Sequence, residues 1–204
     1  MKIKLFCEGK TEKGLRELLR KAVNQDLSKP CGLKIKTFDG VANLLKGIEG
    51  KLKIEFQEGA KVIYLLVDLY RYPNIEPKTL EERVKNVKED IETKLGNRRE
   101  GVKIFVIIHE VETWILADSK AIQKRLKSYT PEAYSNLEQD GKYQQPSKVL
   151  NQIFRQHHPK GYGYEKVVDG VFLLENVDWR MVYATCTVFK SLVDALRDDC
   201  KQFA

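Results

Sequence analysis

The chain has 204 residues, of which 42% are hydrophobic, so it is long enough to bury the core of one α/β domain. Its net charge of +7 favours polyanionic partners such as nucleic acid, although solvated helix faces produce the same balance. No run of 18 apolar residues occurs, and the N-terminus turns polar after seven residues, which argues against a membrane span and a signal peptide.

The four cysteines, Cys7, Cys31, Cys186 and Cys200, lack the CxxC spacing of zinc ligands. Because the chain also shows no export signal, we expect all four to be reduced thiols in a cytoplasmic protein.

Strands and helices alternate through the first half of the chain. Residues 2–7 alternate apolar and polar side chains as a strand does, and residues 11–24 carry apolar side chains at helical spacing, with Thr11 as the expected N-cap. A second strand is expected over 33–38. The glycine-punctuated stretch that follows predicts only a short helix around 41–48.

A continuous apolar run over 62–67 ends in Asp68, which is typical of a central parallel strand covered on both faces. An amphipathic helix is expected over 79–95, where Gly96 ends it, and a fourth strand over 102–108. Connections of this length imply parallel pairing with right-handed crossovers. The predicted class is therefore α/β, a Rossmann-like, mostly parallel sheet of about four strands with helices on both sides.

The second half of the chain changes character, because few strand signals remain. A long polar loop is expected over 127–146. Helices are expected over 111–126, 147–156, 164–174 and 178–201. We expect residues 1–118 to form the α/β core and residues 119–204 a helical region that packs on it or caps it, as one compact unit.

Acidic side chains follow three of the predicted strands. Glu8 follows the first strand, Asp68 the central one, and His109 and Glu110 the fourth. Open parallel sheets bind ligands at this edge, where these groups converge if the strands are neighbours. Two carboxylates about 4 Å apart repel by roughly 4 kcal/mol at an effective dielectric near 20, so a proton, a basic side chain or a hard cation must compensate them.

An oxygen-rich cluster of this kind suits Mg²⁺ or Mn²⁺, and a histidine ligand would favour Mn²⁺. The predicted metal ligands are Glu8, Asp68, Glu110, Glu112 and His109. The predicted catalytic residues are Glu8, Glu12, Asp68 and Glu110. A helix would let only one of Glu110 and Glu112 face the site, and we favour Glu110. Either Glu12 or Glu112 would orient ligands or act as a general base.

The expected phosphate-binding residues are Lys10, Lys148 and Lys166. Every one of the predicted site residues also has a structural interpretation. Glu8 and Glu12 would suit the positive N-terminus of the following helix. Asp68 could cap a loop, His109 could be hydrogen-bonded within one, and Lys10 could simply be solvated.

Six short motifs occur in order along nearly the whole chain. They are EGKTE (8–12), DLYRYP (68–73), HEVETWILAD (109–118), PSKVL (146–150), YEK (164–166) and CTVF (186–189). Each motif alone is weak, but the ordered set resembles an uncharacterised prokaryotic family of TOPRIM-like proteins, a domain-of-unknown-function family. The glutamate–glycine turn and the strand-end aspartate also resemble the TOPRIM fold of primases, topoisomerases and OLD-type nucleases.

The TOPRIM resemblance implies a divalent metal held by Glu8 and Asp68, together with phosphodiester chemistry. The second aspartate of the usual DxD pair is missing, because Tyr70 stands in its place. Glu110 or Glu112 would have to replace it. Proteins of this kind are often found beside ABC-type ATPases and in anti-phage defence, which implies such a partner here.

Three functions are compatible with the sequence. The first is a metal-dependent nuclease whose positive charge gives it salt-dependent affinity for nucleic acid. The second is a non-catalytic scaffold that binds nucleic acid or an ABC-type ATPase partner through Tyr129, Tyr134 and Tyr143, because tyrosines suit interfaces. The third is hydrolysis of a phosphate ester on a small nucleotide with the same acids. The choice between DNA and RNA and the oligomeric state stay open.

Overall fold

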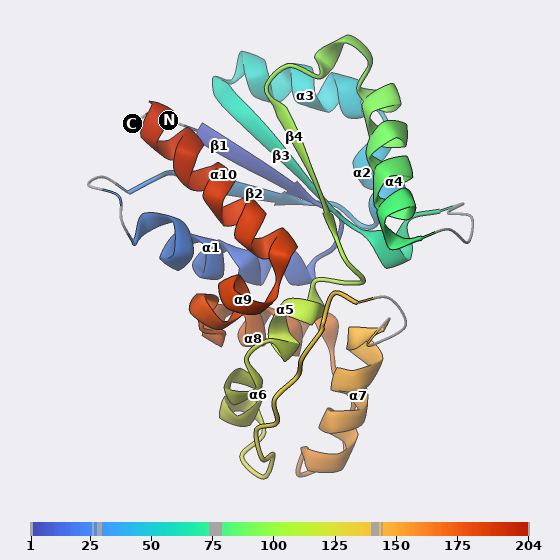
Figure 1. The fold of residues 1–204 in the computed structure, drawn as a ribbon, viewed down its shortest axis with the longest axis vertical. Helices are drawn as coiled ribbons and strands as arrows, with labels where there is room; N and C mark the ends of the chain where they lie inside the picture. The colour runs from blue at the N-terminus through green and yellow to red at the C-terminus, as the bar shows by residue number, and fades with distance from the viewer. Residues whose placement is uncertain are drawn as a thin grey trace.

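The computed structural model describes residues 2–25, 27, 30–73, 79–139, 143 and 145–203. At its centre lies a sheet of four parallel strands in the order β2-β1-β3-β4 (Figure 1). The strands are β1 (Lys2–Cys7), β2 (Leu33–Thr37), β3 (Ala60–Asp68) and β4 (Val102–Ile107). The predicted α/β class is confirmed, and β3 lies between β1 and β4, as a convergent site requires.

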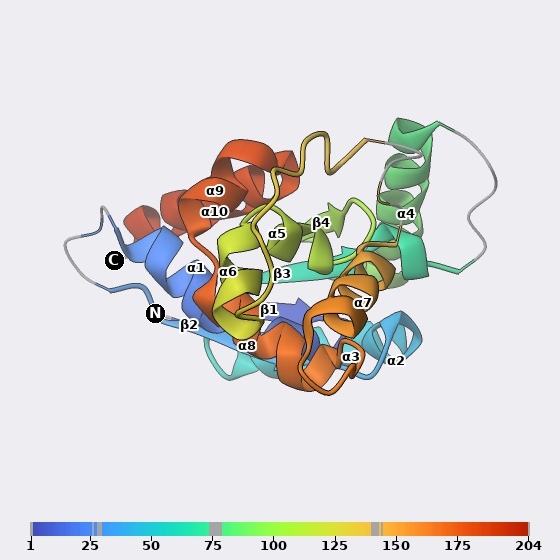
Figure 2. The ribbon, with the colours of Figure 1, turned by 90° about the horizontal axis from the view of Figure 1, so that it is seen from below.

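Helices cover both faces of the sheet, which gives three layers (Figure 1, Figure 2). On one face lie α1 (Leu15–Asn24) and α10 (Thr187–Phe203), and on the other α2 (Val41–Leu45), α3 (Ile48–Gln57) and α4 (Leu80–Leu95). The remaining helices gather beyond the carboxyl ends of the strands. They are α5 (Glu112–Leu116), α6 (Ser119–Arg125), α7 (Pro146–His157), α8 (Val171–Asn176) and α9 (Trp179–Thr185).

Each face of the sheet has its own hydrophobic core. Ile3, Leu5 and Cys7 of β1 pack with α1, α10 and the helices of the second half, whereas Phe6 packs with α2, α3 and α4. Lys4, on the face of Phe6, is buried and forms an ion pair with Glu55 of α3. Because the first core draws on both halves of the chain, the α/β part and the helical part share one apolar interior.

Local sequence explains the bounds of α4, which was expected over 79–95. The Thr79 side chain accepts a hydrogen bond from the backbone N–H of Glu82, and the Glu82 carboxylate accepts one from the backbone N–H of Thr79. This reciprocal capping box satisfies donors that the first turn would otherwise leave unpaired. Gly96 then takes a φ of 54° and ends the helix.

Other helices differ from the expectation. The helix α3 was not predicted beyond the stretch around 41–48. The helix expected over 111–126 is divided, because the carboxylate of Asp118 accepts a hydrogen bond from the backbone N–H of Lys120 (3.2 Å) and starts α6. The helix expected over 178–201 is likewise divided at Cys186 into α9 and α10.

The segment around Thr11 also differs. Thr11 caps no helix; it opens the 3₁₀-helix η1 (Thr11–Gly14), which leads into α1, and its hydroxyl donates to the carbonyl of Lys166 (3.2 Å). The helix expected over 164–174 starts as a π-helix, η4 (Lys166–Gly170), and continues into α8. In the loop expected over 127–146, residues 140–142 and 144 lie outside the described residues, and α7 begins at Pro146.

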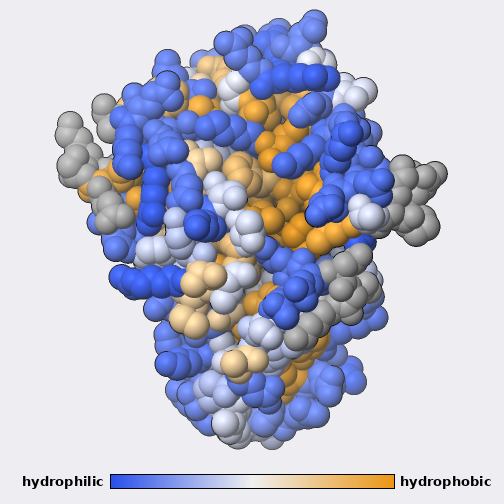
Figure 3. Space-filling view, in the orientation of Figure 1, coloured by the Kyte–Doolittle hydropathy of each residue, from blue (hydrophilic) through white to orange (hydrophobic). Residues whose placement is uncertain are grey.

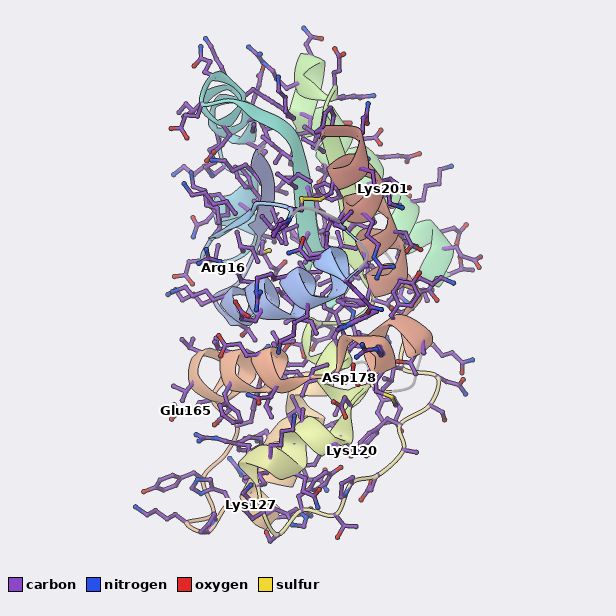
Figure 4. The ribbon with its side chains drawn as sticks, turned by 90° about the vertical axis from the view of Figure 1, so that its left-hand side faces the viewer. Arg16, Lys120, Lys127, Glu165, Asp178 and Lys201 are labelled. Atoms are coloured by element: carbon purple, nitrogen blue, oxygen red, sulfur yellow. A yellow bond between two sulfur atoms is a disulfide. The ribbon has the colours of Figure 1, made fainter. Side chains whose placement is uncertain are left out.

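The cysteines do not all remain thiols, so that prediction is wrong. Cys31, just before β2, forms a disulfide with Cys200 near the end of α10, drawn in yellow in Figure 4, while Cys7 and Cys186 are free and buried. The two partners are 169 residues apart, and no spacing rule links cysteines at that distance. The argument for a cytoplasmic protein from four reduced thiols therefore loses its basis, because disulfides persist mainly in oxidising compartments.

The edge strand β4 leaves apolar surface in view between α10 and α4 (Figure 3). Val102, Ile104 and Phe105 are only partly buried there. In the part of the chain that the structure describes, every helix is too short or too polar to cross a membrane.

Candidate acidic site at the strand ends

A cavity of about 240 Å³ lies at the carboxyl ends of β1 and β3. Its charged lining residues are Glu8, Lys10, Glu12, Asp39, Asp68, Glu112 and Lys166. Four of the carboxylates are almost fully buried, with exposed fractions of 1% for Glu8, 3% for Glu12, 3% for Asp68 and 1% for Glu112. The structure thus brings together acids that follow β1 and β4 and the acid that ends β3, and the acid after β4 that lines the cavity is Glu112, where we favoured Glu110.

Backbone geometry positions the acids of the first turn. Glu8 directly follows β1, and its Oε2 accepts a hydrogen bond from the backbone N–H of Asp68 (3.2 Å). Glu12 Oε1 accepts one from the backbone N–H of Gly9 (3.1 Å). A Cβ at Gly9 would lie 2.7 Å from Glu12 Oε2, so the glycine of EGKTE leaves room for the Glu12 carboxylate.

Burial and mutual repulsion raise the pKa values of three of these acids. Burial, with Glu8 and Glu112 nearby, raises the pKa of Glu12 to about 7. Burial and the neighbouring Glu8 raise the pKa of Asp68 well above its usual value. Burial also raises the pKa of Glu112, although the ammonium of Lys166 opposes that shift. The cluster therefore favours protonation or a bound cation over full ionisation.

Asp68 Oδ1 and Glu112 Oε2 are among the buried carboxylate oxygens that have no hydrogen-bond partner within the described residues. The other oxygen of Glu112 is engaged, because Oε1 accepts from the Tyr164 hydroxyl (3.3 Å) and lies 3.2 Å from Lys166 Nζ. A buried oxygen without a donor is costly, so each of these two atoms suits a proton or a cation.

Glu110 is placed differently from Glu112. Its Oε1 accepts from Lys166 Nζ (2.8 Å), and its Oε2 accepts from the backbone N–H of Ser147 at the start of α7 (3.0 Å). Burial alone would raise the pKa of Glu110, but the hydrogen bonds from Lys166 and Ser147 outweigh it and hold the pKa below its usual value. Both glutamates reach Lys166, but it is Glu112 that lines the cavity.

Of the other predicted residues, Lys10 lines the cavity, whereas His109 and Lys148 do not. Lys10 lines it with a half-exposed side chain and forms an ion pair with Asp39 (3.4 Å). His109 takes a positive φ of 71°, and its Nε2 lies 3.1 Å from the carbonyl of Gln139, outside the cavity lining. Lys148 is exposed on the first turn of α7 and is also absent from that lining.

The segment that carries Lys166 packs closely on the first turn. In Figure 4, α8 lies against α1, between the labels Arg16 and Glu165. A Cβ at Gly14 would lie 2.7 Å from the carbonyl of Val171, so η1 and α8 approach too closely for any side chain there. This packing places Lys166, from the second half of the chain, beside the acids of the first half.

Two contributors to the site were not predicted. Asp39 follows β2, so the rule of acids at strand ends would have found it. Tyr164 contacts Glu112 and belongs to the same YEK motif as Lys166, which was the available signal.

The donor set suits a hard divalent cation. All the acids offer oxygen, and Mg²⁺ is commonly held by one or two carboxylates and several waters. Within the described residues, no group of three or more His, Cys, Asp or Glu side chains is already disposed to hold a metal ion. Asp68 and Glu112 each carry an unsatisfied buried oxygen and line the same cavity, so their chemistry suits such an ion.

The model of one protein family, described as a domain of unknown function (DUF4276), matches residues 7–197. The chain belongs to the DUF4276 family. The matched region begins at Cys7, the last residue of β1, and includes the whole acidic site and most of α10, so the family is defined over both halves of the fold. No curated protein and no solved structure matches the chain.

Proposed function

We propose that this DUF4276 protein binds Mg²⁺ or Mn²⁺ and hydrolyses phosphodiester bonds. The observation that carries the proposal is the pair of buried oxygens, Asp68 Oδ1 and Glu112 Oε2, that have no hydrogen-bond partner among the described residues. Both residues line one cavity with Glu8 and Glu12 at the carboxyl ends of parallel strands, where such sheets bind ligands.

The residues divide into three roles in this proposal. Asp68 and Glu112 hold the ion, and Glu8, tied to the backbone of Asp68, lies beside them. When bound, the ion would polarise a phosphoryl oxygen and lower the pKa of a water molecule. Glu12, whose pKa is raised to about 7, is poised to accept a proton at Oε2, because Oε1 is held by the N–H of Gly9. Lys10, half-exposed at the cavity, would meet the phosphate.

The relation to TOPRIM proteins is part of the same proposal. The parallel sheet, with a glutamate after β1 and an aspartate as the last residue of β3, supports it. Tyr70, which stands where TOPRIM proteins carry a second aspartate, lies in the 3₁₀-helix η2 (Leu69–Arg71), and its N–H donates to the carbonyl of His109 (3.2 Å). We assign the missing carboxylate to Glu112, because both oxygens of Glu110 already accept hydrogen bonds, from Lys166 and Ser147.

The test combines metal binding with cleavage. Metal-free protein is titrated with Mn²⁺ by calorimetry, and plasmid DNA and total RNA are incubated with it in Mn²⁺, Mg²⁺ or EDTA. We expect Asp68→Asn to lose both the heat of binding and cleavage, while Asp198→Asn, on the exposed face of α10, retains both. Cleavage that persists in EDTA or in Asp68→Asn contradicts the proposal, and the nucleic acid that is cut identifies the substrate.

A second candidate is a non-catalytic module that binds nucleic acid or an ABC-type ATPase. It is favoured by the lack of any ready group of three metal ligands in the described part of the chain and by the lysine already seated between Glu110 and Glu112. Absence of both Mn²⁺ binding and cleavage, with nucleic acid still bound in a gel-shift assay, would favour this function.

A further inference from the structure

We infer that Lys166 occupies the place of a second cation, so that the site takes a single divalent ion per chain. The inference rests on the proposed metal site and names its stoichiometry. It follows from how the oxygens of Glu110 and Glu112 are shared out.

Lys166 Nζ bridges two buried carboxylates. It lies 2.8 Å from Glu110 Oε1 and 3.2 Å from Glu112 Oε1, and the side chains of both glutamates are at most 2% exposed. Buried carboxylates need a counter-charge, and an ammonium with three donors supplies it to both at once. A metal ion that bridged the same two oxygens would have to displace this ammonium.

Between Glu110 and Glu112, hydrogen bonds and ion pairs leave one carboxylate oxygen for an ion. Glu112 Oε1 contacts Lys166 and Tyr164. Glu112 Oε2 and Asp68 Oδ1 are left to bind the ion. Glu110 gives Oε1 to Lys166 and Oε2 to the N–H of Ser147. A second ion would therefore find no uncommitted oxygen on Glu110 and only the shared Oε1 on Glu112.

The backbone of Lys166 is fixed independently of its side chain. The carbonyl of Lys166 accepts from the Thr11 hydroxyl (3.2 Å), and Lys166 opens the π-helix η4, a geometry often found at functional sites. Removing the side chain should thus leave the segment in place and open a negatively charged space between Glu110 and Glu112. This makes the inference testable by substitution.

The experiment counts Mn²⁺ ions bound per chain by calorimetry, without any activity assay. We expect one ion in the wild type, one in Lys166→Arg, which keeps the cation, and two in Lys166→Ala. The control is Lys127→Ala, an exposed lysine after α6 that should bind one ion. Adding Glu110→Gln to Lys166→Ala removes a ligand of the new position and should return the count to one.

Each other result overturns the inference in a distinct way. Two ions in the wild type, or one ion in a folded Lys166→Ala variant, would show that Lys166 fills no cation position. If Lys166→Ala fails to melt cooperatively, the wild-type count still decides whether the site binds one ion or two. No binding in the wild type would instead overturn the metal site itself, and so the proposed function.

Discussion

The carboxylate of Glu8 accepts a hydrogen bond from the backbone N–H of Asp68 across 3.2 Å, which ties the end of β1 to the end of β3. The contact fixes the relative position of two predicted metal ligands through the backbone. A glutamine can keep the hydrogen bond through its amide oxygen but carries no charge.

Glu8→Gln should therefore separate activity from folding. We expect metal-dependent cleavage to fall by at least about 100-fold, since even outer partners of metal sites contribute roughly 10–100-fold. The melting temperature should stay near that of the wild type, because the link to Asp68 is kept. Cleavage at the wild-type rate in a folded Glu8→Gln protein would remove Glu8 from the site.

The pKa of Glu12, raised from 4.5 to about 7, makes stability depend on pH in the metal-free protein. The folded state holds this proton more tightly than the unfolded chain, so its contribution is complete below about pH 4.5 and is lost as the pH rises through 7. A shift of this size corresponds to roughly 3 kcal/mol in the free energy of unfolding. The Glu12→Gln protein should not show this loss of stability as the pH rises.

The measurement is urea unfolding in EDTA at pH 5 and pH 8. Between the two pH values, the wild type should lose more stability than Glu12→Gln. Because the charge of Glu12 also raises the pKa of Asp68, the difference reports Glu12 together with its coupling to Asp68. Parallel pH profiles for the two proteins would mean that neither burial nor the neighbouring acids perturb the Glu12 carboxyl.

Glu110 connects the end of β4 to α7 through the N–H of Ser147. Glu110→Ala would leave a half-buried donor and the ammonium of Lys166 without this acceptor, at a cost of roughly 2 kcal/mol. Glu110→Gln keeps an acceptor for Ser147 and should cost less. Amide exchange in the first turn of α7 should accelerate in Glu110→Ala, and exchange unchanged there would show that α7 does not depend on Glu110.

The Cys31–Cys200 disulfide closes a loop of 169 residues and should stabilise the fold strongly. In the chain-entropy account, its loss costs about 5 kcal/mol, which lowers the melting temperature of a protein of this size by roughly 10 °C or more. Reductant should have this effect on the wild type and none on Cys31→Ser. Thiol titration of the unreduced, unfolded protein should find two free cysteines, Cys7 and Cys186; four would contradict the bond.

The sequence predicted the part of the site that depends on strand ends. Apolar runs located β3 and β4, so Asp68 and Glu112 could be brought to one edge before any side-chain geometry was known. The choice between Glu110 and Glu112 was different, because it depends on where α5 begins. A pattern of apolar residues cannot fix that start to within one residue.

The parts that could not be predicted depend on contacts between distant segments. Asp118 divides α5 from α6 and also accepts from the N–H of Asp178 (2.8 Å), a contact between residues 60 positions apart. The position of Lys166 depends on η4 being π-helical and packed on η1, and periodicity does not distinguish that geometry from an α-helix. The disulfide between Cys31 and Cys200 likewise depends on a contact between distant segments, 169 residues apart.

Lys166 also belongs to a segment that is synthesised after the acids it meets. A ribosome adds roughly 5–20 residues per second, so Lys166 follows Glu112 by several seconds. During that interval the nascent chain already contains the acids at positions 8, 12, 68, 110 and 112 but not the ammonium that bridges Glu110 and Glu112. A prematurely terminated product that ends before Lys166 would carry the carboxylates without their counter-charge. Assembly of the finished site is thereby coupled to translation of the segment that carries Lys166.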